Sequence, residues 1–321
     1  MDWIMPMEPI SSMTIPVGEE WVYQIKWDGI RGLVYCQKNG DEKQIRIFTK
    51  KRRDRTVFYP ELHCLTDLIT VDSAVFDGEI VVLELDGRPS FQLSLIRERV
   101  GDPGRLAYYT SRYPVIYVIF DILYYQDRLL TGLPLHQRYE VLSHSLRPGP
   151  NTIITENYTE GPELFDLMKK RGWEGMVSKK RESLYLPAKN HREWFKHKGL
   201  KKILAVVCVI EWKDASFPRS LILGIYQQNN WIFIGNASLG LTQDDWYRLT
   251  GYASAFKMES SPFQDIRRWK GKQVTWLKPL LICWVRFLEW TNDGALRHPV
   301  ILGFSEGSAA QANGKEWFID E

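Results

Sequence analysis

The first 200 residues alternate short apolar runs with polar turn residues, a pattern that is typical of strands. The runs 32–38 and 43–49 flank Asn39-Gly40-Asp41 and predict a hairpin, because both central positions of a type I′ turn need positive φ. A second hairpin is predicted around Asp86-Gly87, which separates an apolar run from the segment 88–91. The N-terminal part of the chain therefore contains antiparallel strands.

One longer run and three helical patterns complete this part. The segment 113–125 is almost entirely apolar or β-branched and predicts a strand buried on both faces. Helices are expected at 60–69, 134–146 and 162–172. In the last of these, Pro162 suits the first turn and Gly172 the exit.

Beyond Lys202 the pattern changes to strands with a single helix. Strands are predicted at 203–212, 220–228, 231–239, 275–290 and 298–304, with a hairpin turn at Asn229-Asn230. Thr242 and Asp245 form the signature of a helix-capping box. Five strands and a helix are the content of a small barrel such as an OB-fold. We therefore expect an α+β protein with a mixed domain at 1–199 and an all-β OB-fold domain at 200–321, divided near Gly199.

Composition then narrows the class of protein. Of the 321 residues, 44% are hydrophobic and 25% are charged, which excludes a wholly disordered or fibrous chain. The net charge is only +3, so a polyanion would have to be bound by local clusters of cations. Eight of the 13 Trp residues lie in the second domain. We expect most of these to be core residues, although an OB-fold can also use aromatic side chains to stack on bases.

The cellular compartment follows from the cysteines and the N-terminus. The four cysteines are widely spaced, without a CxxC pair or a Cys/His pattern, so neither a disulfide framework nor a zinc site is predicted. The first ten residues lack the basic and apolar regions of a signal peptide, and no run is long enough for a membrane helix. We expect a cytoplasmic protein with no membrane association.

Charged residues interrupt several apolar strands. The segment 23–32 carries Lys26, Asp28 and Arg31 around Gly29, which permits a sharp turn or a close backbone approach. Further charges in apolar surroundings are Asp77, Glu79, Asp121, Glu174, Lys179, Lys196 and Lys198. Such side chains are costly to bury unless they are paired or liganded. We therefore expect them to converge on one cleft.

Such a cleft would suit a phosphate-bearing ligand. Two carboxylates can hold a hard cation such as Mg²⁺, and several Lys and Arg residues can neutralise phosphates. Crowding by other cations would lower the pKa of a lysine and make its amine available as a nucleophile toward phosphorus. Neither a Walker A sequence nor GxGxxG is present, so a P-loop or a Rossmann turn is not supported.

The order of five segments resembles the ATP-dependent DNA ligases of the covalent nucleotidyltransferase superfamily. KWDGIR, FDGEIVV, VIFDIL, EGMVSK and WFKHK look like their motifs I, III, IIIa, IV and V. Three flanking segments, FYPEL, PLHQRYEVL and FLEWTNDGALRHPVILGF, resemble the bacterial subgroup. The similarity covers about residues 20–304. It implies a nucleotidyltransferase (adenylation) domain followed by an OB-fold domain that closes over the duplex.

The resemblance also implies roles for individual residues. Lys26 would become AMP-modified, and Arg31 would contact the nucleotide or the nick. Asp28 would support the loop or the leaving 3′-oxygen. The implied catalytic set is Lys26, Asp28, Arg31, Lys196 and Lys198. The implied ATP-binding set is Gln24, Ile25, Lys26, Arg31, Lys50, Glu79, Phe120, Glu174, Lys196 and Lys198, with Glu79 on the ribose, Phe120 on the adenine, and Lys196 and Lys198 on the α-phosphate.

Metal and DNA contacts are implied in the same way. Glu79 and Glu174 would hold Mg²⁺ or Mn²⁺, and the basic run would touch the DNA backbone through Lys50, Lys51, Arg52 and Arg53. Read without the resemblance, the run is an ordinary solvated loop. The implied partner is nicked double-stranded DNA, together with end-joining or repair proteins, for a monomer that is nucleoid-associated during function.

Four sites depart from the family pattern. Gln24 stands where the family usually has Glu, and Thr49-Lys50 stands where it has Ser-Arg; Lys cannot reproduce a bidentate Arg contact. After 298–304 the basic motif VI is replaced by Ser305-Glu306-Gly307, and Trp284 replaces a common Glu. Adenylation from free ATP would then be slow or helped by other cations.

Two other classes of function stay open. The first is an RNA ligase or a capping-type nucleotidyltransferase. The second is a non-catalytic relative that binds nicked DNA but has lost adenylation together with motif VI. The sequence does not distinguish replication, recombination and end joining.

Overall fold

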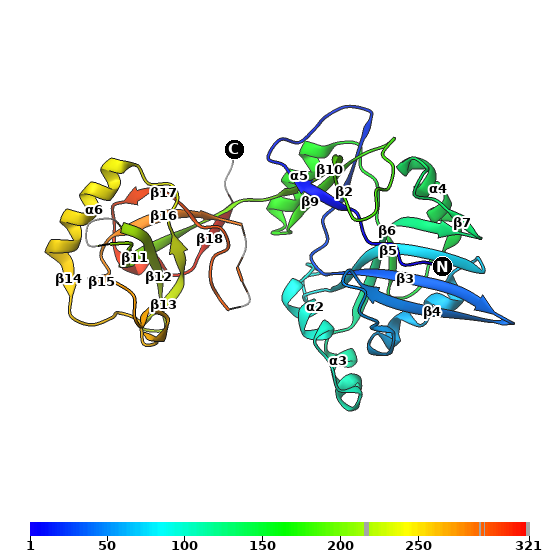
Figure 1. Ribbon diagram of the computed structural model, residues 1–321, viewed down its shortest axis with the longest axis horizontal. Helices are drawn as coiled ribbons and strands as arrows, with labels where there is room; N and C mark the ends of the chain where they lie inside the picture. Colours follow the sequence, from blue (N-terminus) through cyan, green and yellow to red (C-terminus); the bar gives the residue numbers. More distant parts are fainter. Residues whose placement is uncertain (215–217, 289, 292, 319–321) are drawn as a thin grey trace. The chain divides into compact units, whose positions relative to one another are not determined.

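A computed structural model gives the three-dimensional structure of the chain (Figure 1). It describes residues 1–214, 218–288, 290–291 and 293–318. The contacts divide the chain into two compact units, Met1–Lys198 and Gly199–Glu321. Among the described residues, no helix combines the length and the apolar character that crossing a bilayer requires.

The larger sheet of the first unit has six strands in the order β4-β3-β5-β6-β7, with β8 beside β6. Their bounds are β3 Ile30–Asn39, β4 Glu42–Thr49, β5 Ser73–Val82, β6 Val115–Tyr125, β7 Arg128–Leu129 and β8 Thr152–Ile154. All pairs are antiparallel except β6 with β8. The sheet therefore has the antiparallel character that the hairpin signals predict.

Alternate residues of these strands face two different cores. Along β3, Val34 and Cys36 lie in one apolar cluster, whereas Leu33 and Tyr35 lie in another, because successive side chains point to opposite faces of a sheet. β6 also contributes to both clusters, which confirms that this strand is buried on both faces.

Helices close the first of these cores. The helices of the first unit are α1 Leu65–Leu68, α2 Phe91–Glu98, α3 Leu106–Arg112, α4 Leu135–Ser145 and α5 Gly161–Lys170, with 3-10 turns η1 Thr56–Phe58, η2 Pro60–Leu62 and η3 Pro103–Arg105. Leu62, Leu65 and Leu142, from η2, α1 and α4, pack into that core. The sheet is therefore covered by short helical segments on this face.

A smaller sheet closes the second core. Its strands lie in the order β1-β10-β9-β2, with bounds β1 Glu8–Ser11, β2 Trp21–Ile25, β9 Gly175–Lys180 and β10 Asn190–Lys198. Val22 and Trp194 pack from this sheet against the larger one. Leu164 and Met168 of α5 pack on its other face. The two sheets thus meet face to face, and the candidate site lies where they meet.

The second unit is a strongly bent eight-stranded sheet with one α-helix. Its elements are β11 Lys201–Trp212, β12 Pro218–Gln227, β13 Asn230–Ala237, α6 Gln243–Phe256, β14 Lys257–Met258, η4 Arg267–Trp269, β15 Val274–Leu277, β16 Ile282–Phe287, β17 Val300–Ser305, η5 Ala309–Gln311 and β18 Glu316–Phe318. The long β11 pairs with β12, β15, β16 and β18. Both bonds of the capping box between Thr242 and Asp245 start α6, as the sequence predicts.

Several predicted elements differ in detail. The hairpin after β3 turns at Gly40 with φ +63, but Asp41 has no positive φ. The second hairpin stops after the bridge between Leu83 and Pro89, because Ser90 caps α2. The run 60–69 forms two short helical pieces instead of one helix. The prediction of a single strand at 275–290 is wrong, since the chain leaves the sheet between β15 and β16 around Pro279. These departures occur at turns, whereas the strongly periodic segments follow the prediction.

The tryptophans of the second unit are less buried than we predict from composition. Trp269 is buried, whereas Trp212, Trp231, Trp246, Trp276, Trp284, Trp290 and Trp317 are partly buried. Five of the eight belong to an apolar cluster separate from the main core. The main core is built from alternate residues such as Ile203 and Val285, so most of the indoles pack on the barrel surface and not inside it.

Candidate active site

One cavity of the first unit collects most of the residues that the sequence predicts to act together. Its volume is about 220 Å³, and strands of both sheets contribute to its lining. The predicted residues that line it are Gln24, Ile25, Lys26, Arg31, Lys50, Glu79, Phe120, Lys196 and Lys198. Glu174 joins them through ion pairs with two of the lining lysines. The prediction that residues more than 150 positions apart converge is therefore met for this set.

Glu174 holds two lysines with its two carboxylate oxygens. The ammonium of Lys26 donates to Oε2 at 2.5 Å, and Nζ of Lys198 lies 2.5 Å from Oε1. Gly175 makes this arrangement possible, since it has φ +142 and a Cβ there would lie 2.0 Å from the carbonyl oxygen of His197. Only glycine permits this close approach of β9 to β10, and the approach places Glu174 beside Lys198.

The charge state of Lys26 differs from our expectation. The sequence predicts that neighbouring cations lower its pKa. Burial does act in that direction, but the carboxylates of Glu174 and Glu79 outweigh it and raise the pKa of Lys26 above its ordinary value. The pKa of Lys196 is lowered, by burial first and then by Lys26 and Lys198. In this structure the candidate nucleophile is therefore a paired ammonium, and it must leave Glu174 and lose a proton before it can attack.

Arg31 lines the cavity and is held by a buried carboxylate, that of Asp77. Its Nε and Nη2 atoms donate to the two oxygens of Asp77, each at 2.6 Å, and the Tyr185 hydroxyl donates to the same carboxylate at 2.6 Å. The guanidinium carbon lies 4.6 Å from the centroid of the Phe120 ring. Asp77 is fully buried, so it positions Arg31 and does not itself face a ligand.

Glu79 is the second carboxylate of the cavity. Burial raises its pKa to about 8, the cations Lys26 and Arg31 counteract this, and Glu174 and Asp28 add to it. Asp28 is thus close enough to act electrostatically on Glu79, but it is absent from the cavity lining. The predicted catalytic role of Asp28 stays a prediction.

The carboxylates set a limit on metal binding. No cluster of three or more Asp, Glu, His or Cys side chains arranged for a metal ion occurs in the part of the chain that the structure describes. Glu174 and Glu79 supply two carboxylates, and Mg²⁺ is commonly held by one or two carboxylates plus substrate phosphates. The residues therefore fit a cation only if phosphate oxygens complete its ligand shell.

The cavity lining also contains five residues that we do not predict: Glu8, Pro9, Trp27, Val177 and Trp194. Lys179, which we expect in the cleft but give no role, lines the cavity as well. Lys179 is buried and its Nζ has no hydrogen-bond partner among the described residues. That atom lies 4.6 Å from the Phe120 centroid and 4.1 Å from that of Trp194. Burial lowers the pKa of Lys179 to about 7. Because side chains alternate along a strand, Lys179 lies on the same face of β9 as Val177. This alternation was the signal in the sequence that could have identified Val177 as a cavity residue.

Two charged residues that we expect in the cleft, Asp77 and Asp121, are absent from the cavity lining. Asp121 is fully buried and receives two hydrogen bonds from Arg138, at 2.8 and 2.9 Å. Arg138 also donates to the carbonyl oxygens of Leu133 and Ser183. The prediction that Asp121 faces the cleft is therefore wrong. Its charge is compensated within the fold, where it ties α4 to β6.

The basic run after β4 is less free than its sequence suggests. Lys50 pairs with Glu8 at the cavity, and Arg53 lies 3.7 Å from Glu98. Arg52 has φ 59 and lies 6.0 Å from the Trp3 ring, while Lys51 is exposed. Arg55, the last cation of the run, is buried and bonds to Glu98 and nearby carbonyl oxygens. The segment thus joins the cavity through Lys50 and offers Lys51 through Arg53 at the surface.

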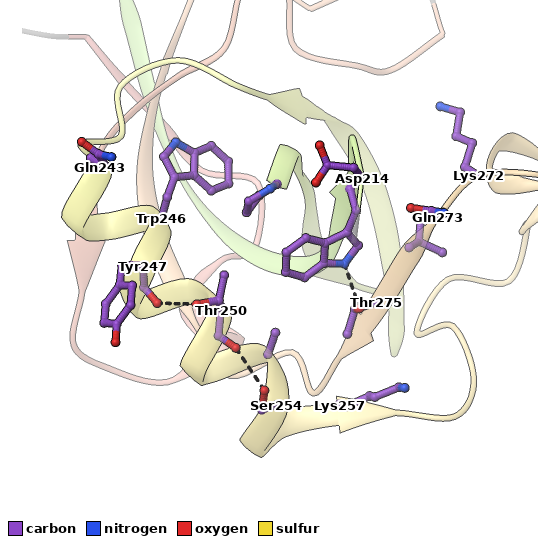
Figure 2. Close-up of a pocket in the computed structure, with 14 residues that line it drawn as sticks. Asp214, Gln243, Trp246, Tyr247, Thr250, Ser254, Lys257, Lys272, Gln273 and Thr275 are labelled. Carbon is purple, nitrogen blue, oxygen red and sulfur yellow. Dashed lines mark hydrogen bonds between the residues drawn. The ribbon is translucent and has the colours of Figure 1, made fainter. Parts of the chain in front are cut away.

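The second unit has a larger hollow of its own. It lies between α6 and the strands β11 and β15, and its volume is about 1140 Å³ (Figure 2). The labelled side chains include Trp246 and Thr250 on α6 and Lys272 and Thr275 on the opposite side. The indole N–H of Trp212 donates to Thr275 at 2.9 Å. The lining of the hollow, as far as the structure describes it, has no carboxylate pair or lysine cluster like that of the first unit, so we do not assign the nucleotide chemistry to it.

Comparison with known families supports the division of roles. Residues 6–198 match the family described as ATP dependent DNA ligase domain, and residues 214–307 match the ATP dependent DNA ligase C terminal region. Two segments that differ in architecture thus match two consecutive parts of one enzyme family.

Individual relatives agree with this match. The multifunctional non-homologous end joining DNA repair protein LigD of Mycobacterium tuberculosis is 30% identical over 284 residues, which are 87% of this chain and 35% of LigD. The chain thus spans about a third of the length of that relative. DNA ligase C1 of Mycolicibacterium smegmatis is 26% identical, and the match covers 92% of this chain and 88% of that protein.

Solved structures show the same likeness. The ligase domain of M. tuberculosis LigD is 26% identical with a TM-score of 0.53, and the match covers 97% of this chain and 98% of that domain. A mycobacterial DNA ligase D complexed with ATP and MES is 27% identical with a TM-score of 0.53, covering 96% of this chain and 97% of that one. These likenesses confirm the predicted α+β fold with its all-β second domain.

Proposed function

The chain belongs to the ATP-dependent DNA ligase family, and we propose that it seals nicks in duplex DNA through a covalent AMP adduct of Lys26. One observation carries the residue assignment: Lys26 shares Glu174 with Lys198 in a cavity that also contains Glu79, Arg31 and Phe120. A lysine amine, phosphate-binding cations and an aromatic ring thus lie in one small space.

The proposed reaction has three displacements at phosphorus. Deprotonated Nζ of Lys26 attacks the α-phosphorus of ATP, a P–N bond forms, and the bond to pyrophosphate breaks. The 5′-phosphate at a nick then attacks the lysyl-AMP phosphorus, which releases Lys26 and forms a DNA-adenylate. Finally the 3′-hydroxyl attacks the 5′-phosphorus, loses its proton, and expels AMP.

The surrounding residues would prepare these steps. Lys196 and Lys198 would hold the α-phosphate, and the pKa of Lys196 is lowered by burial first and then by the neighbouring cations Lys26 and Lys198. Phe120 would take one face of the adenine, and Arg31, fixed by Asp77, would contact the nucleotide or the nick. Gln24, Ile25, Lys50 and Glu79 complete the proposed nucleotide contacts. Asp28 would support the loop around Lys26.

A metal ion would complete the arrangement. Mg²⁺ or Mn²⁺ held by Glu79, Glu174 and phosphate oxygens would neutralise triphosphate charge and compete with Lys26 for Glu174. The protein residues would then hold and orient the phosphates, and they would leave the amine of Lys26 facing the α-phosphorus.

Labelled ATP tests the proposal directly. With Mg²⁺ and α-labelled ATP, we expect covalent label on the wild-type chain and on Lys38→Ala, an exposed lysine of the same unit, but none on Lys26→Ala. A nicked duplex should then be sealed by the two labelled proteins. Wild-type protein without label would contradict the enzymatic proposal, and binding to the nick in that case would identify a non-catalytic relative.

Substrate choice distinguishes the remaining alternatives. Label from GTP in preference to ATP would favour a capping-type nucleotidyltransferase, and sealing of nicked RNA but not DNA would favour an RNA ligase. We include the non-catalytic alternative in the experiment because Ser305-Glu306-Gly307 replaces motif VI.

The wider setting is also a proposal. The LigD relatives are named for end joining and repair, but this chain spans only 35% of their length. We propose repair of nicked duplex DNA by a monomer in the cytoplasm, nucleoid-associated during function, together with end-joining or repair proteins. Lys50, Lys51, Arg52 and Arg53 would contact the DNA backbone.

A further inference from the structure

The outer face of the barrel carries two tryptophans and two cations on neighbouring strands, and a third cation, Lys315, directly before β18. Lys202 of β11 is opposite Trp317 of β18 on one side and opposite Arg286 of β16 on the other. Residues directly opposite each other in an antiparallel pair lie on one face of the sheet. The next row on this face places Leu204 opposite Trp284. We call Trp284, Trp317, Lys202, Arg286 and Lys315 the Trp–Lys face.

The face lies outside the barrel. On β16, the alternate residues Cys283, Val285 and Phe287 belong to the main core, so Trp284 and Arg286 point away from it. Trp284 and Trp317 are partly buried against the outer apolar cluster. This face is therefore not required to fill the interior.

The two indoles border a small hollow. Their ring centroids lie 5.2 Å apart at an angle of 75°. A hollow of about 330 Å³ adjoins them, and its lining residues are Leu204, Trp284, Ser305, Gln311, Asn313, Lys315 and Trp317. Aromatic walls with two amide side chains and a hydroxyl resemble the environment that holds an unstacked base, since a base offers a π face and a hydrogen-bonding edge.

The cations are placed for phosphates. Nζ of Lys202 lies 5.3 Å from the Trp284 centroid, and Nζ of Lys315 lies 5.3 Å from that of Trp317. Among the described residues, Lys202, Arg286 and Lys315 form no ion pair. Two acidic residues are close in sequence: Glu316 is bound by Lys201 and Trp290, and Glu306 is exposed after β17. The face therefore presents positive charge beside aromatic walls.

We propose that the Trp–Lys face binds unpaired nucleotides of single-stranded DNA, with bases on Trp284 and Trp317 and phosphates on Lys202, Arg286 and Lys315. A paired base is already stacked within its duplex, so the hollow can admit only a base that has left the stack. This site goes beyond the proposed function, because sealing a nick requires only duplex DNA. Its natural ligand is a single-stranded flap or overhang next to the site of joining.

Binding of oligonucleotides by the full-length chain, without ATP, tests the proposal. We expect oligo(dT) of 12 nucleotides to bind about tenfold or more tightly than an abasic deoxyribose-phosphate strand with the same number of phosphates. Trp284→Leu and Trp317→Leu should remove most of that difference. Trp212→Leu, a partly buried indole elsewhere on the barrel, is the matched control and should preserve it.

Salt dependence tests the phosphate contacts. Each of Lys202→Gln, Arg286→Gln and Lys315→Gln should reduce the slope of log affinity against log salt by about 0.7 for the single strand. Lys257→Gln in the hollow of Figure 2 is the control and should leave the slope unchanged. These substitutions remove charge but leave both indoles in place, so they keep the test valid if a Trp variant fails to fold.

Three results would overturn the proposal. Equal affinity of wild type for oligo(dT) and the abasic strand would exclude base binding, and unchanged affinity of both Trp variants would place the bases elsewhere. Loss of lysyl-AMP formation in Trp284→Leu and Lys202→Gln, with oligo(dT) binding unchanged, would assign the face to the triphosphate of ATP. Sealing of a flush nick should be retained by all face variants, so failure of this proposal is distinguishable from failure of the proposed ligase activity.

Discussion

The cavity of the first unit has two halves in which the same residue type behaves in opposite ways. In one half, Lys26 is paired with Glu174, and its pKa is raised. In the other half, Lys179 lies between the rings of Phe120 and Trp194 without a hydrogen-bond partner in the described residues, and its pKa is lowered to about 7. Burial acts in the same direction on both, so the partner decides the charge state.

We infer from this difference that the two halves bind different parts of ATP. In the proposed reaction, phosphate and metal would replace the lysine cations beside Glu174 when ATP binds. The aromatic half presents the rings of Phe120 and Trp194, which would suit a flat base. Four predictions test this division, in order of decreasing expected effect.

Lys26→Arg separates the charge of Lys26 from its nucleophilicity. Arginine stays protonated and can still pair with Glu174, but it has no amine available for attack. We expect lysyl-AMP formation to fall by at least about 10³-fold, while the free energy of unfolding changes by about 1 kcal/mol or less. Label incorporation and urea unfolding measure the two quantities, and residual adenylation at the wild-type rate would remove Lys26 from the reaction.

Gly175→Ala tests whether backbone approach creates the carboxylate half. A Cβ at this position would lie 2.0 Å from the His197 carbonyl oxygen, and φ +142 is strained for alanine. We expect a loss of about 2 to 5 kcal/mol in unfolding free energy together with loss of adenylation. Gly172→Ala, where a Cβ would meet open space but φ is also positive, is the control. Equal effects of the two variants would show that φ strain alone is responsible.

Lys179→Met tests the aromatic half through pH. Because the pKa of Lys179 is about 7 in the folded protein and 10.5 in its ordinary state, the unfolded chain binds the extra proton between these values. Stability should therefore rise with pH above about 7 in wild type relative to Lys179→Met, by up to about 1.4 kcal/mol per pH unit. Below pH 7 the free energies of unfolding of the two proteins should change with pH in the same way. Urea unfolding at pH 7 and 9 measures this, and identical pH profiles would contradict the lowered pKa.

Phe120→Leu tests stacking with the smallest expected effect. Leucine keeps much of the apolar volume but loses the ring, and aromatic stacking contributes about 0.5–1.5 kcal/mol. We expect the KM for ATP in lysyl-AMP formation to rise about 2- to 10-fold with little change in the maximal rate. Leu123→Ile, a buried change in the same strand at a residue that does not line the cavity, provides the control. A fall in maximal rate without a change in KM would place the base elsewhere.

Sequence patterns predict the backbone of this cavity well, because strand periodicity and turn residues act locally. Residues such as Lys26 and Glu79 stand out, since a charge within an apolar strand requires a partner. The identity of that partner does not follow from the pattern. Asp121 looks like a cleft residue but is neutralised by Arg138, which is 17 positions away in the chain.

The second unit is harder to predict for the same physical reason. Its strands are evident from their apolar runs, but both faces of a strand such as β11 are apolar. The sequence therefore does not tell which tryptophans lie inside the barrel. Only register, such as Lys202 opposite Trp317, shows which side chains share the outer face.

Peptide mapping of the AMP adduct tests the central assignment most directly. After incubation with ATP and Mg²⁺, the intact chain is digested and the AMP-bearing peptide is sequenced by mass spectrometry. We predict a single adduct on the peptide that contains Lys26, on its side-chain nitrogen. An adduct on Lys179, Lys196 or Lys198 in place of Lys26 would contradict the account.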